Sequence, residues 1–419
     1  MTRSGLPVVG IAVPAALVAG ALGWLGIVTI GMQLGAATPS NLGFDLELLL
    51  QAGRDIAHGR SPYAPELING SAPTATHLFY SYPPPVAQAF AILAFLPSNL
   101  ALFAWCLVAI GGLLAVSEVL RRHYAPERSL VEALVVTAAV APLMLPFAVG
   151  LLFGNYDILF PLLYGGMLLA AVAPTRASTL FGGAALVVAS LKIHPASMGL
   201  WFLVRAFRER SDRRAGGSAR VLVTAAVVGL SIIGLSLIVG GAGIWEEYVK
   251  VIAAGTRAVI VDPRNAGIAA MVAGAIGGGD ELARTLHLAV GVAALAVTAW
   301  AAWRRADPLE SFAWATAVSL ASLPVTWYHY PSAMIPIAIA VLFRARGRAI
   351  SPVRWLLVAA VMVAAVAIAV LPLIYVGIGL VIAAARRSAA ASDEVRPAPS
   401  RASASASIPG GAPGFREGG

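Results

Sequence analysis

The chain has 419 residues, of which 59% are hydrophobic and only 12% are charged, and its mean hydropathy is +0.83. Soluble domains average roughly 25% charged residues, so this composition excludes a soluble globular protein and predicts an all-α polytopic membrane protein. The net charge of +9 does not indicate nucleic-acid binding, because the arginines cluster between apolar runs, as they do in short cytoplasmic loops of membrane proteins. The single cysteine, Cys106, excludes a disulfide framework and a multi-cysteine metal site.

About twelve membrane crossings are predicted when every arginine cluster is placed on the cytoplasmic side. The first apolar run reaches the ~20 residues that span a bilayer, so we interpret it as a retained anchor and not as a cleaved signal peptide. The run 84–120 contains LPSNL and is too long for one crossing. It forms either two spans, which would put Arg121 outside, or a short re-entrant piece followed by one span, which we favour. The runs are 6–31, 84–120, 130–150, 157–174, 177–192, 195–206, 219–243, 284–303, 310–326, 331–344, 352–371 and 372–385.

These runs predict two regions. Residues 1–387 should form a transmembrane bundle whose longest external segments, 32–83 and 244–283, carry amphipathic helices at the membrane surface. Residues 388–419 are rich in alanine, serine, proline and glycine and should form a disordered cytoplasmic tail.

The first external segment places a carboxylate on the apolar face of a predicted helix. Over residues 44–58 most charged side chains share one arc at helical spacing, but Asp45 falls in the opposite, apolar arc. A helix lying on the membrane surface would direct Asp45 toward the bundle, where an unpaired carboxylate is costly. Two interpretations stay open: Asp45 caps the helix by binding free backbone N–H groups, or it is the general base of a site at the lipid–water boundary.

Other polar residues interrupt apolar runs on the same side of the membrane. Lys192 and His194 stand in SLKIHPAS, and Asn155 and Asp157 stand in LFGNYDILF. The third segment, PVTWYHYPSA, contains Trp327, Tyr328, His329 and Tyr330. Histidines and aromatic residues at helix ends often form only an interfacial belt, but ionisable residues in apolar surroundings also mark functional sites. A lysine and two histidines facing one carboxylate would suit a phosphate-bearing lipid and a hydroxylated acceptor. No metal-ligand cluster and no phosphate-binding glycine loop is found, so neither a metal nor another cofactor is expected.

Taken in order, several segments resemble one enzyme family. The segments are AGRDIAHGRSPY, FYSYPPP, GNYDILF, LKIHP, WEEYVKV, DPRNAGI and WYHYP. They are similar to the polyprenol-phosphate-mannose-dependent mannosyltransferases of actinobacteria, GT-C glycosyltransferases whose type is the phosphatidylinositol-mannoside α-1,2-mannosyltransferase. The resemblance implies a GT-C-type bundle in the plasma membrane that transfers mannose from polyprenyl-phosphate-mannose to a glycolipid acceptor on the outer face, among membrane lipids and without nucleic acid.

The resemblance also implies roles for individual residues. Asp45 matches the family's catalytic acid and His329 the histidine beside it, while Lys192 and His194 match the corner near the donor phosphate. The pattern departs from the family at Gly154-Asn155 and at NAGI, which bear on the acceptor contacts. The expected substrate-binding residues are Arg54, Tyr63, Tyr82, Asn155, Arg264, Asn265, Trp327 and Tyr328.

Three alternatives remain. A transporter or lipid flippase would also bury charges in a helical bundle, but near the bilayer midplane. A non-catalytic assembly factor would use the external helix as a docking surface. An enzyme transferring another sugar, such as arabinofuranose, is not distinguished by these residues.

Overall fold

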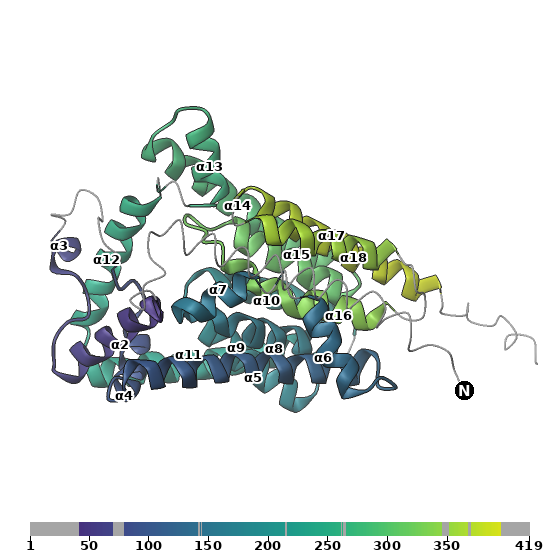
Figure 1. Ribbon diagram of the computed structural model, residues 1–419, viewed down its shortest axis with the longest axis horizontal. Helices are drawn as coiled ribbons and strands as arrows, with labels where there is room; N and C mark the ends of the chain where they lie inside the picture. Colours follow the sequence, from purple (N-terminus) through teal and green to yellow (C-terminus); the bar gives the residue numbers. More distant parts are fainter. Residues whose placement is uncertain are drawn as a thin grey trace, which may run out of the picture.

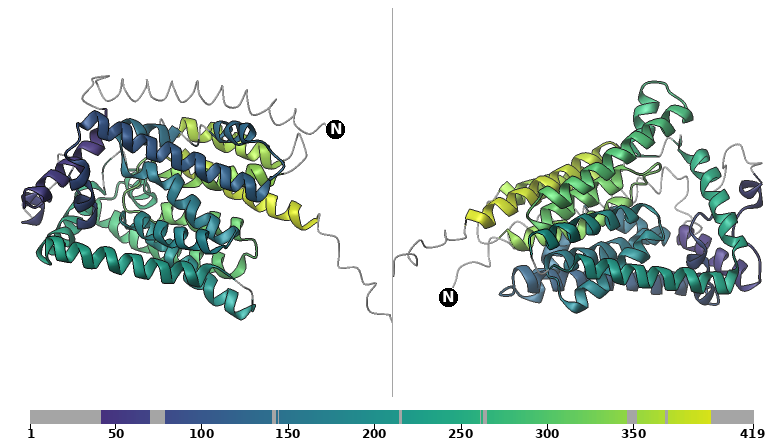
Figure 2. Two further views of the ribbon diagram at one scale, coloured as in Figure 1. Left: turned by 90° about the horizontal axis from the view of Figure 1, so that it is seen from below. Right: turned by 180° about the vertical axis from the view of Figure 1, so that it is seen from behind.

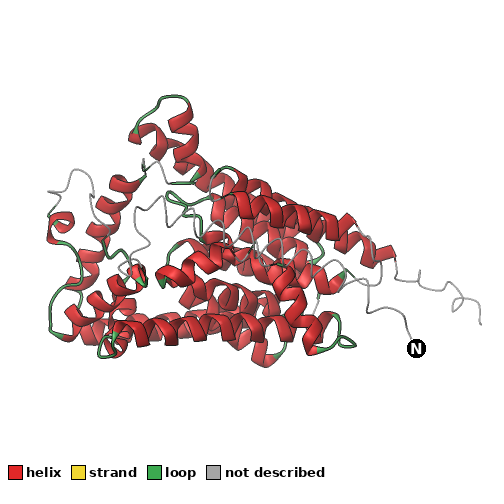
Figure 3. Cartoon of the chain, in the orientation of Figure 1, coloured by secondary structure: helices red, strands yellow, loops and turns green. Residues whose placement is uncertain are grey.

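The structure is a computed structural model that describes residues 42–69, 79–140, 143, 145–213, 216–260, 262, 265–345, 352–367 and 370–394. Throughout these residues every regular element is a helix, which confirms the predicted all-α class (Figure 3). The predicted anchor 6–31 lies outside the described residues. The elements are α2 (Phe44–Ala57), α3 (Pro65–Ile68), α4 (Pro84–Leu93), α5 (Ser98–Tyr124), α6 (Leu130–Ala139), α7 (Leu145–Phe153), η2 (Tyr156–Leu159), α8 (Phe160–Val172), α9 (Arg176–Ser190), η3 (His194–Ala196), α10 (Ser197–Ser211), α11 (Ser218–Gly240), α12 (Gly243–Val259), α13 (Ile268–Ala275), α14 (Asp280–Arg304), α15 (Pro308–Ala321), η4 (Tyr330–Met334), α16 (Ile335–Arg344), α17 (Pro352–Val366) and α18 (Leu373–Glu394).

Four helices in the described part of the chain are long and apolar enough to cross a membrane: α5, α11, α14 and α18. The remaining apolar runs form shorter helices, so the predicted twelve crossings are not confirmed. The run 84–120 divides into the short α4 and the long α5, as expected. The run 130–150 divides into α6, which ends at Ala139, and α7, which begins at Leu145. Pro146 lies in the first turn of α7, where a proline is tolerated, although it would interrupt a continuous helix.

The two ends of the bundle differ in character. The purple helices α2 and α3 lie at one end, and the yellow end of α18 lies at the other (Figures 1 and 2). The helix α5 joins the two: Ser98 at its start donates a hydrogen bond to Glu47 of α2, and its remaining length packs against α16. The end at α2 therefore holds the first external segment, and the opposite end holds the loops that follow α5, α14 and α16.

Arginines gather on one of those loops, residues 305–307. The guanidinium groups of Arg205 and Arg208 both donate to the carbonyl of Arg305, at 2.9 and 2.7 Å. Arg344 pairs with Asp307 at 2.7 Å. We call this end of the bundle the arginine end. Its basic loops are the ones that the sequence assigns to the cytoplasm.

The centre of the bundle is a dense aromatic and aliphatic core between α8, α10, α15 and α16. Trp201, Phe202 and Phe312 are fully buried in it with their rings edge to face. The indole N–H of Trp201 donates to the hydroxyl of Ser311 at 2.9 Å, so its one polar group is satisfied. In contrast, α11 and α14 expose rows of leucine, isoleucine and valine, as expected of helices that face lipid.

The helix α18 is longer than the apolar run that predicts it. It continues through Ser388 to Glu394, so helix occupies the start of the predicted tail 388–419. Ser388 is buried, and its hydroxyl donates to the carbonyl of Ala385. The alanines of this stretch favour helix strongly, which explains why the helix passes the last apolar residue.

A glycine lets α2 dock against the turn that follows α7. Gly154 has φ +66°, in the left-handed region that favours glycine, and a Cβ at this position would lie 2.6 Å from the Cβ of Leu46 in α2. The amide of Gly43, which precedes α2, donates to the carbonyl of Leu152 at 2.8 Å. The two segments are therefore in backbone contact.

We predict that Gly154→Ala destabilises the protein by about 1–3 kcal/mol, because the new methyl group overlaps α2 and the backbone is strained. Thermal unfolding in detergent measures the effect. Gly291→Ala in α14 is the matched control, since a Cβ there meets no atom within 4 Å. An equal melting temperature for both variants would contradict this account of the turn.

Candidate functional site

A buried carboxylate lies at the end of the bundle that holds α2. Asp157 is in η2, the turn between α7 and α8, and its side chain is 1% exposed. Asn155 caps this turn, because its side-chain oxygen accepts a hydrogen bond from the amide of Asp157 at 2.9 Å. This local hydrogen bond helps to fix the backbone position of Asp157.

Two basic side chains from distant parts of the chain meet this carboxylate. The ammonium of Lys192, just after α9, lies 2.7 Å from Oδ2 of Asp157. Nε2 of His329, just before η4, lies 2.9 Å from the same oxygen. A buried charge is tolerated only when it is paired, so these contacts explain why an ionised group is stable among apolar helices.

Asn155 joins this group to the first external segment. Its amide nitrogen donates to Oδ2 of Asp45 at 2.8 Å, and its amide oxygen accepts from the ammonium of Lys192 at 3.4 Å. We call Asp45, Asn155, Asp157, Lys192 and His329 the polar cluster. It places two carboxylates in different surroundings: Asp157 is buried, whereas Asp45 is partly exposed.

The position of Asp45 bears on its two interpretations. The residue that caps α2 is Gly43, and no side chain forms a capping hydrogen bond there. The carboxylate of Asp45 instead contacts Asn155, 110 positions further along the chain. This argues against the interpretation of Asp45 as a helix cap.

Tyrosine rings flank the lysine of the cluster. The ammonium of Lys192 lies 4.5 Å from the ring centre of Tyr330 and 5.5 Å from that of Tyr82, within the range of cation–π attraction. Burial, and then the charge of Asp157, raise the pKa of Tyr82, so its phenol stays protonated. The hydroxyl of Tyr63 donates to the carbonyl of Tyr82 at 2.9 Å and holds that backbone in place.

Other predicted site residues lie apart from the cluster. Arg54 is on the outer arc of α2, where it contacts Glu47 and Gln51. Trp327 is half-buried against the main core. Arg264 and the side chain of His194 lie outside the described residues.

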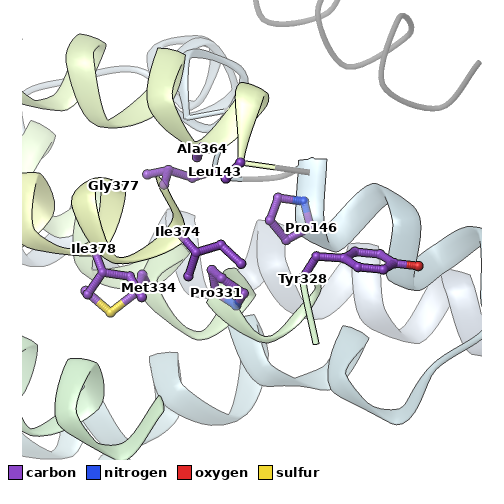
Figure 4. A pocket seen from close by; sticks show the side chains of 10 residues that line it. Leu143, Pro146, Tyr328, Pro331, Met334, Ala364, Ile374, Gly377 and Ile378 are labelled. Carbon is purple, nitrogen blue, oxygen red and sulfur yellow. The ribbon is translucent and has the colours of Figure 1, made fainter. Parts of the chain in front are cut away.

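Tyr328, in the loop before η4, lies at the edge of an apolar hollow (Figure 4). Pro331 and Met334 of η4 line the hollow together with Ile374 and Ile378 of α18. The hydroxyl of Tyr328 points away from these lining residues. Its hydroxyl therefore adds no polar group to the hollow.

Asn265 has a structural role. Its amide nitrogen donates to the carbonyls of Ile260 and Pro324, at 3.0 and 2.8 Å. Its amide oxygen accepts from the amides of Gly267 and Thr326, at 2.7 and 2.8 Å. Both donors and both acceptor positions of the side chain are thus occupied, which argues against the predicted substrate contact.

Asp157 and Tyr330 stand at two of the predicted polar junctions, but the sequence assigned neither of them a role in the site. An acid inside an apolar run was the available signal for Asp157. Within the described residues no three metal-ligating side chains converge, so we assign no metal ligand.

The fold and the cluster define a class of protein. The helical bundle has several apolar helices long enough to cross a membrane, arginine-rich loops at one end and the polar cluster at the other. This is the architecture of a multi-pass membrane protein. Residues 80–327, more than half of the chain, match the family described as Glycosyltransferase family 87.

The chain belongs to glycosyltransferase family 87 and is a membrane glycosyltransferase of the GT-C type. The predicted glycosyltransferase class is thereby confirmed. Searches of curated proteins and of solved structures gave no match.

We predict that Asn265→Ala lowers stability by roughly 1–3 kcal/mol, because buried backbone groups lose their partners. Active enzyme should retain the wild-type KM for its acceptor. Thermal unfolding and initial rates measure the two effects, with Asn99→Ala at the exposed start of α5 as the control. A raised acceptor KM with unchanged stability would instead support the predicted substrate contact of Asn265.

Proposed function

We propose that this glycosyltransferase moves mannose from a polyprenyl-phosphate-mannose donor to a lipid-linked mannoside acceptor, such as a phosphatidylinositol mannoside, on the outer face of the plasma membrane. The observation that carries the proposal is the bridge through Asn155, which links a partly exposed carboxylate, Asp45, to a cationic group, Lys192. Transfer from a lipid phosphate needs both: a base for the acceptor and positive charge for the leaving group.

Asp45 is the proposed general base. Of the two carboxylates in the cluster it is the accessible one, because Asp157 is buried. The hydrogen bond from Asn155 holds one of its oxygens and orients the other. As the acceptor oxygen bonds to the anomeric carbon, Asp45 takes the hydroxyl proton, and the bond from the anomeric carbon to the phosphate oxygen breaks.

Lys192 and His329 are the proposed stabilisers of the departing phosphate. The phosphodiester of the donor carries one negative charge, and the polyprenyl phosphate released gains a second. Two basic side chains at one place oppose that growing charge. His194 remains a predicted partner in this role. A single displacement of this kind inverts the anomeric centre, so a β-linked donor gives an α-linked product.

The orientation follows from the distribution of arginine. If the loops at the arginine end are cytoplasmic, as the positive-inside rule expects, the polar cluster at the other end faces the outer side. The second external segment lies there too, since Ser61 after α2 donates to Glu247 of α12 at 2.5 Å. A lipid-borne donor and a lipid-borne acceptor could then both enter from the outer leaflet.

The alternatives are less well supported. A transporter would place its ionisable groups midway along the spans, whereas the cluster joins the turn after α7, the end of α9 and the loop before η4. Transfer of another sugar, such as arabinofuranose, would use the same base and the same cations. The identity of the sugar therefore rests on the resemblance to mannosyltransferases.

We predict that Asp45→Asn and Asp45→Ala reduce mannose transfer at least about 100-fold, because the acceptor hydroxyl loses its base. Membranes containing each variant are supplied with polyprenyl-phosphate-mannose and a phosphatidylinositol mannoside, and product is quantified with protein levels matched. Asp55→Asn is the control: Asp55 is on the same helix, but it pairs with Arg60 away from the cluster.

Equal rates for wild type and both Asp45 variants would remove the proposed base. Transfer of arabinofuranose from its lipid phosphate, without transfer of mannose, would keep the base and change the donor.

A further inference from the structure

We propose that Asp157 is a positioning residue for glycosyl transfer, whose carboxylate holds the side chains of Lys192 and His329 together at the donor phosphate; this inference rests on the proposed function. The contacts on one oxygen, Oδ2, carry it. Lys192 Nζ is 2.7 Å away and His329 Nε2 is 2.9 Å away.

The backbone of Asp157 is fixed on both sides. Its amide donates to the side chain of Asn155 at 2.9 Å, and its carbonyl accepts a hydrogen bond from Ser332 at 3.3 Å. Ser332 lies in η4, the turn that follows His329. The carboxylate and the histidine are therefore tied together twice, once through side chains and once through this turn.

The charge of Asp157 has a definite task in this arrangement. Both basic side chains contact the same carboxylate oxygen, in buried surroundings where electrostatic interactions are strong. The carboxylate thereby keeps both side chains near the place where negative charge develops. Without it, the lysine and the histidine would lose their shared partner, and the leaving phosphate would lose part of its stabilisation.

Asp157 is poorly placed to act as a base itself. Its side chain is 1% exposed, and Oδ2 is occupied by two basic groups. Oδ1 is also buried and accepts no hydrogen bond from the described residues. A substrate hydroxyl has no path to either oxygen in this geometry. The carboxylate acts through Lys192 and His329, and Asp45 is left as the base.

The test compares Asp157→Asn with a matched buried acid. Glu310 is 7% exposed and lies 3.5 Å from Arg305 at the arginine end, so Glu310→Gln also removes a buried carboxylate from an ion pair. We expect Asp157→Asn to lower kcat roughly 100-fold with little change in the donor KM, since a misplaced catalytic group costs about that much. Glu310→Gln should keep the wild-type kcat per folded molecule.

A double-mutant cycle separates positioning from a general loss of structure. If Asp157 acts through the histidine, Asp157→Asn should lower kcat much less in a His329→Gln background than in the wild type. Equal fold losses in the two backgrounds would overturn the proposal. So would an Asp157→Asn enzyme that is as fast as Glu310→Gln.

A second measurement, of melting temperatures, tests the proposal even if the Asp157→Asn variant folds poorly. Lys192→Met leaves Asp157 buried with one partner fewer and should lower the melting temperature of the purified protein. Asp157→Asn/Lys192→Met removes both charges, so it should recover much of that loss while staying inactive. Additive effects on the melting temperature would show that Asp157 does not hold Lys192 and would overturn the proposal.

The failures of the two proposals differ. Wild-type protein that transfers neither mannose nor arabinofuranose from a lipid phosphate refutes the proposed function, and this inference with it. Wild-type protein that transfers mannose, together with an Asp157→Asn variant that matches Glu310→Gln, refutes this inference alone.

Discussion

A carboxylate placed inside a helical membrane bundle must have charged partners, and the partners of Asp157 come from segments far apart in the chain. Burying an ion without a partner costs several kcal/mol. The requirement is met by Lys192 after α9 and by His329 before η4. The turn after α7 and these two loops must therefore meet at one end of the bundle. Because Asn155 also reaches Asp45, the same meeting point fixes the first external segment.

The protein separates two kinds of charge. The arginines of the arginine end bind a backbone carbonyl and a carboxylate of the loop 305–307, as Arg205 does with Arg305 and Arg344 with Asp307. They tie this loop to α10 and α16. The polar cluster at the other end has fewer charges, but they lie against one another and against tyrosine rings. The long helix α5 and the aromatic core keep the two ends apart, so orientation and chemistry depend on different residues.

Much of the fold follows from the sequence, because composition and apolar runs report helices directly. The division of 84–120 into a short and a long helix followed from its length and from LPSNL, and the basic loops followed from arginine spacing. The number of crossings did not follow, since a run such as 130–150 has the length of one span but forms two short helices, the second with Pro146 in its first turn. Helix length thus depends on residues such as proline that limit where a helix can continue, and a count of apolar residues does not include this effect.

The site was only partly predictable. Helical spacing indicated that Asp45 faces inward, because one residue out of phase with its neighbours is visible in a periodic pattern. The central position of Asp157 was not visible, since its partners lie 35 and 172 positions away and no local pattern encodes them. Asn265 shows the converse. Its place in the predicted external loop suggested a substrate contact, but its side-chain amide forms hydrogen bonds with backbone groups of residues that are distant in sequence.

The central claim is that the polar cluster catalyses a single displacement at the anomeric carbon of a lipid-phosphate sugar. The most direct measurement is the anomeric configuration of the product formed by purified protein in lipid vesicles, supplied with a β-linked polyprenyl-phosphate-mannose and a mannoside acceptor. The account predicts an α-linked mannoside, determined by NMR of the isolated glycolipid. A β-linked product would contradict it, because retention requires a second displacement, in which an accessible carboxylate such as Asp45 would act as a nucleophile and not as the base.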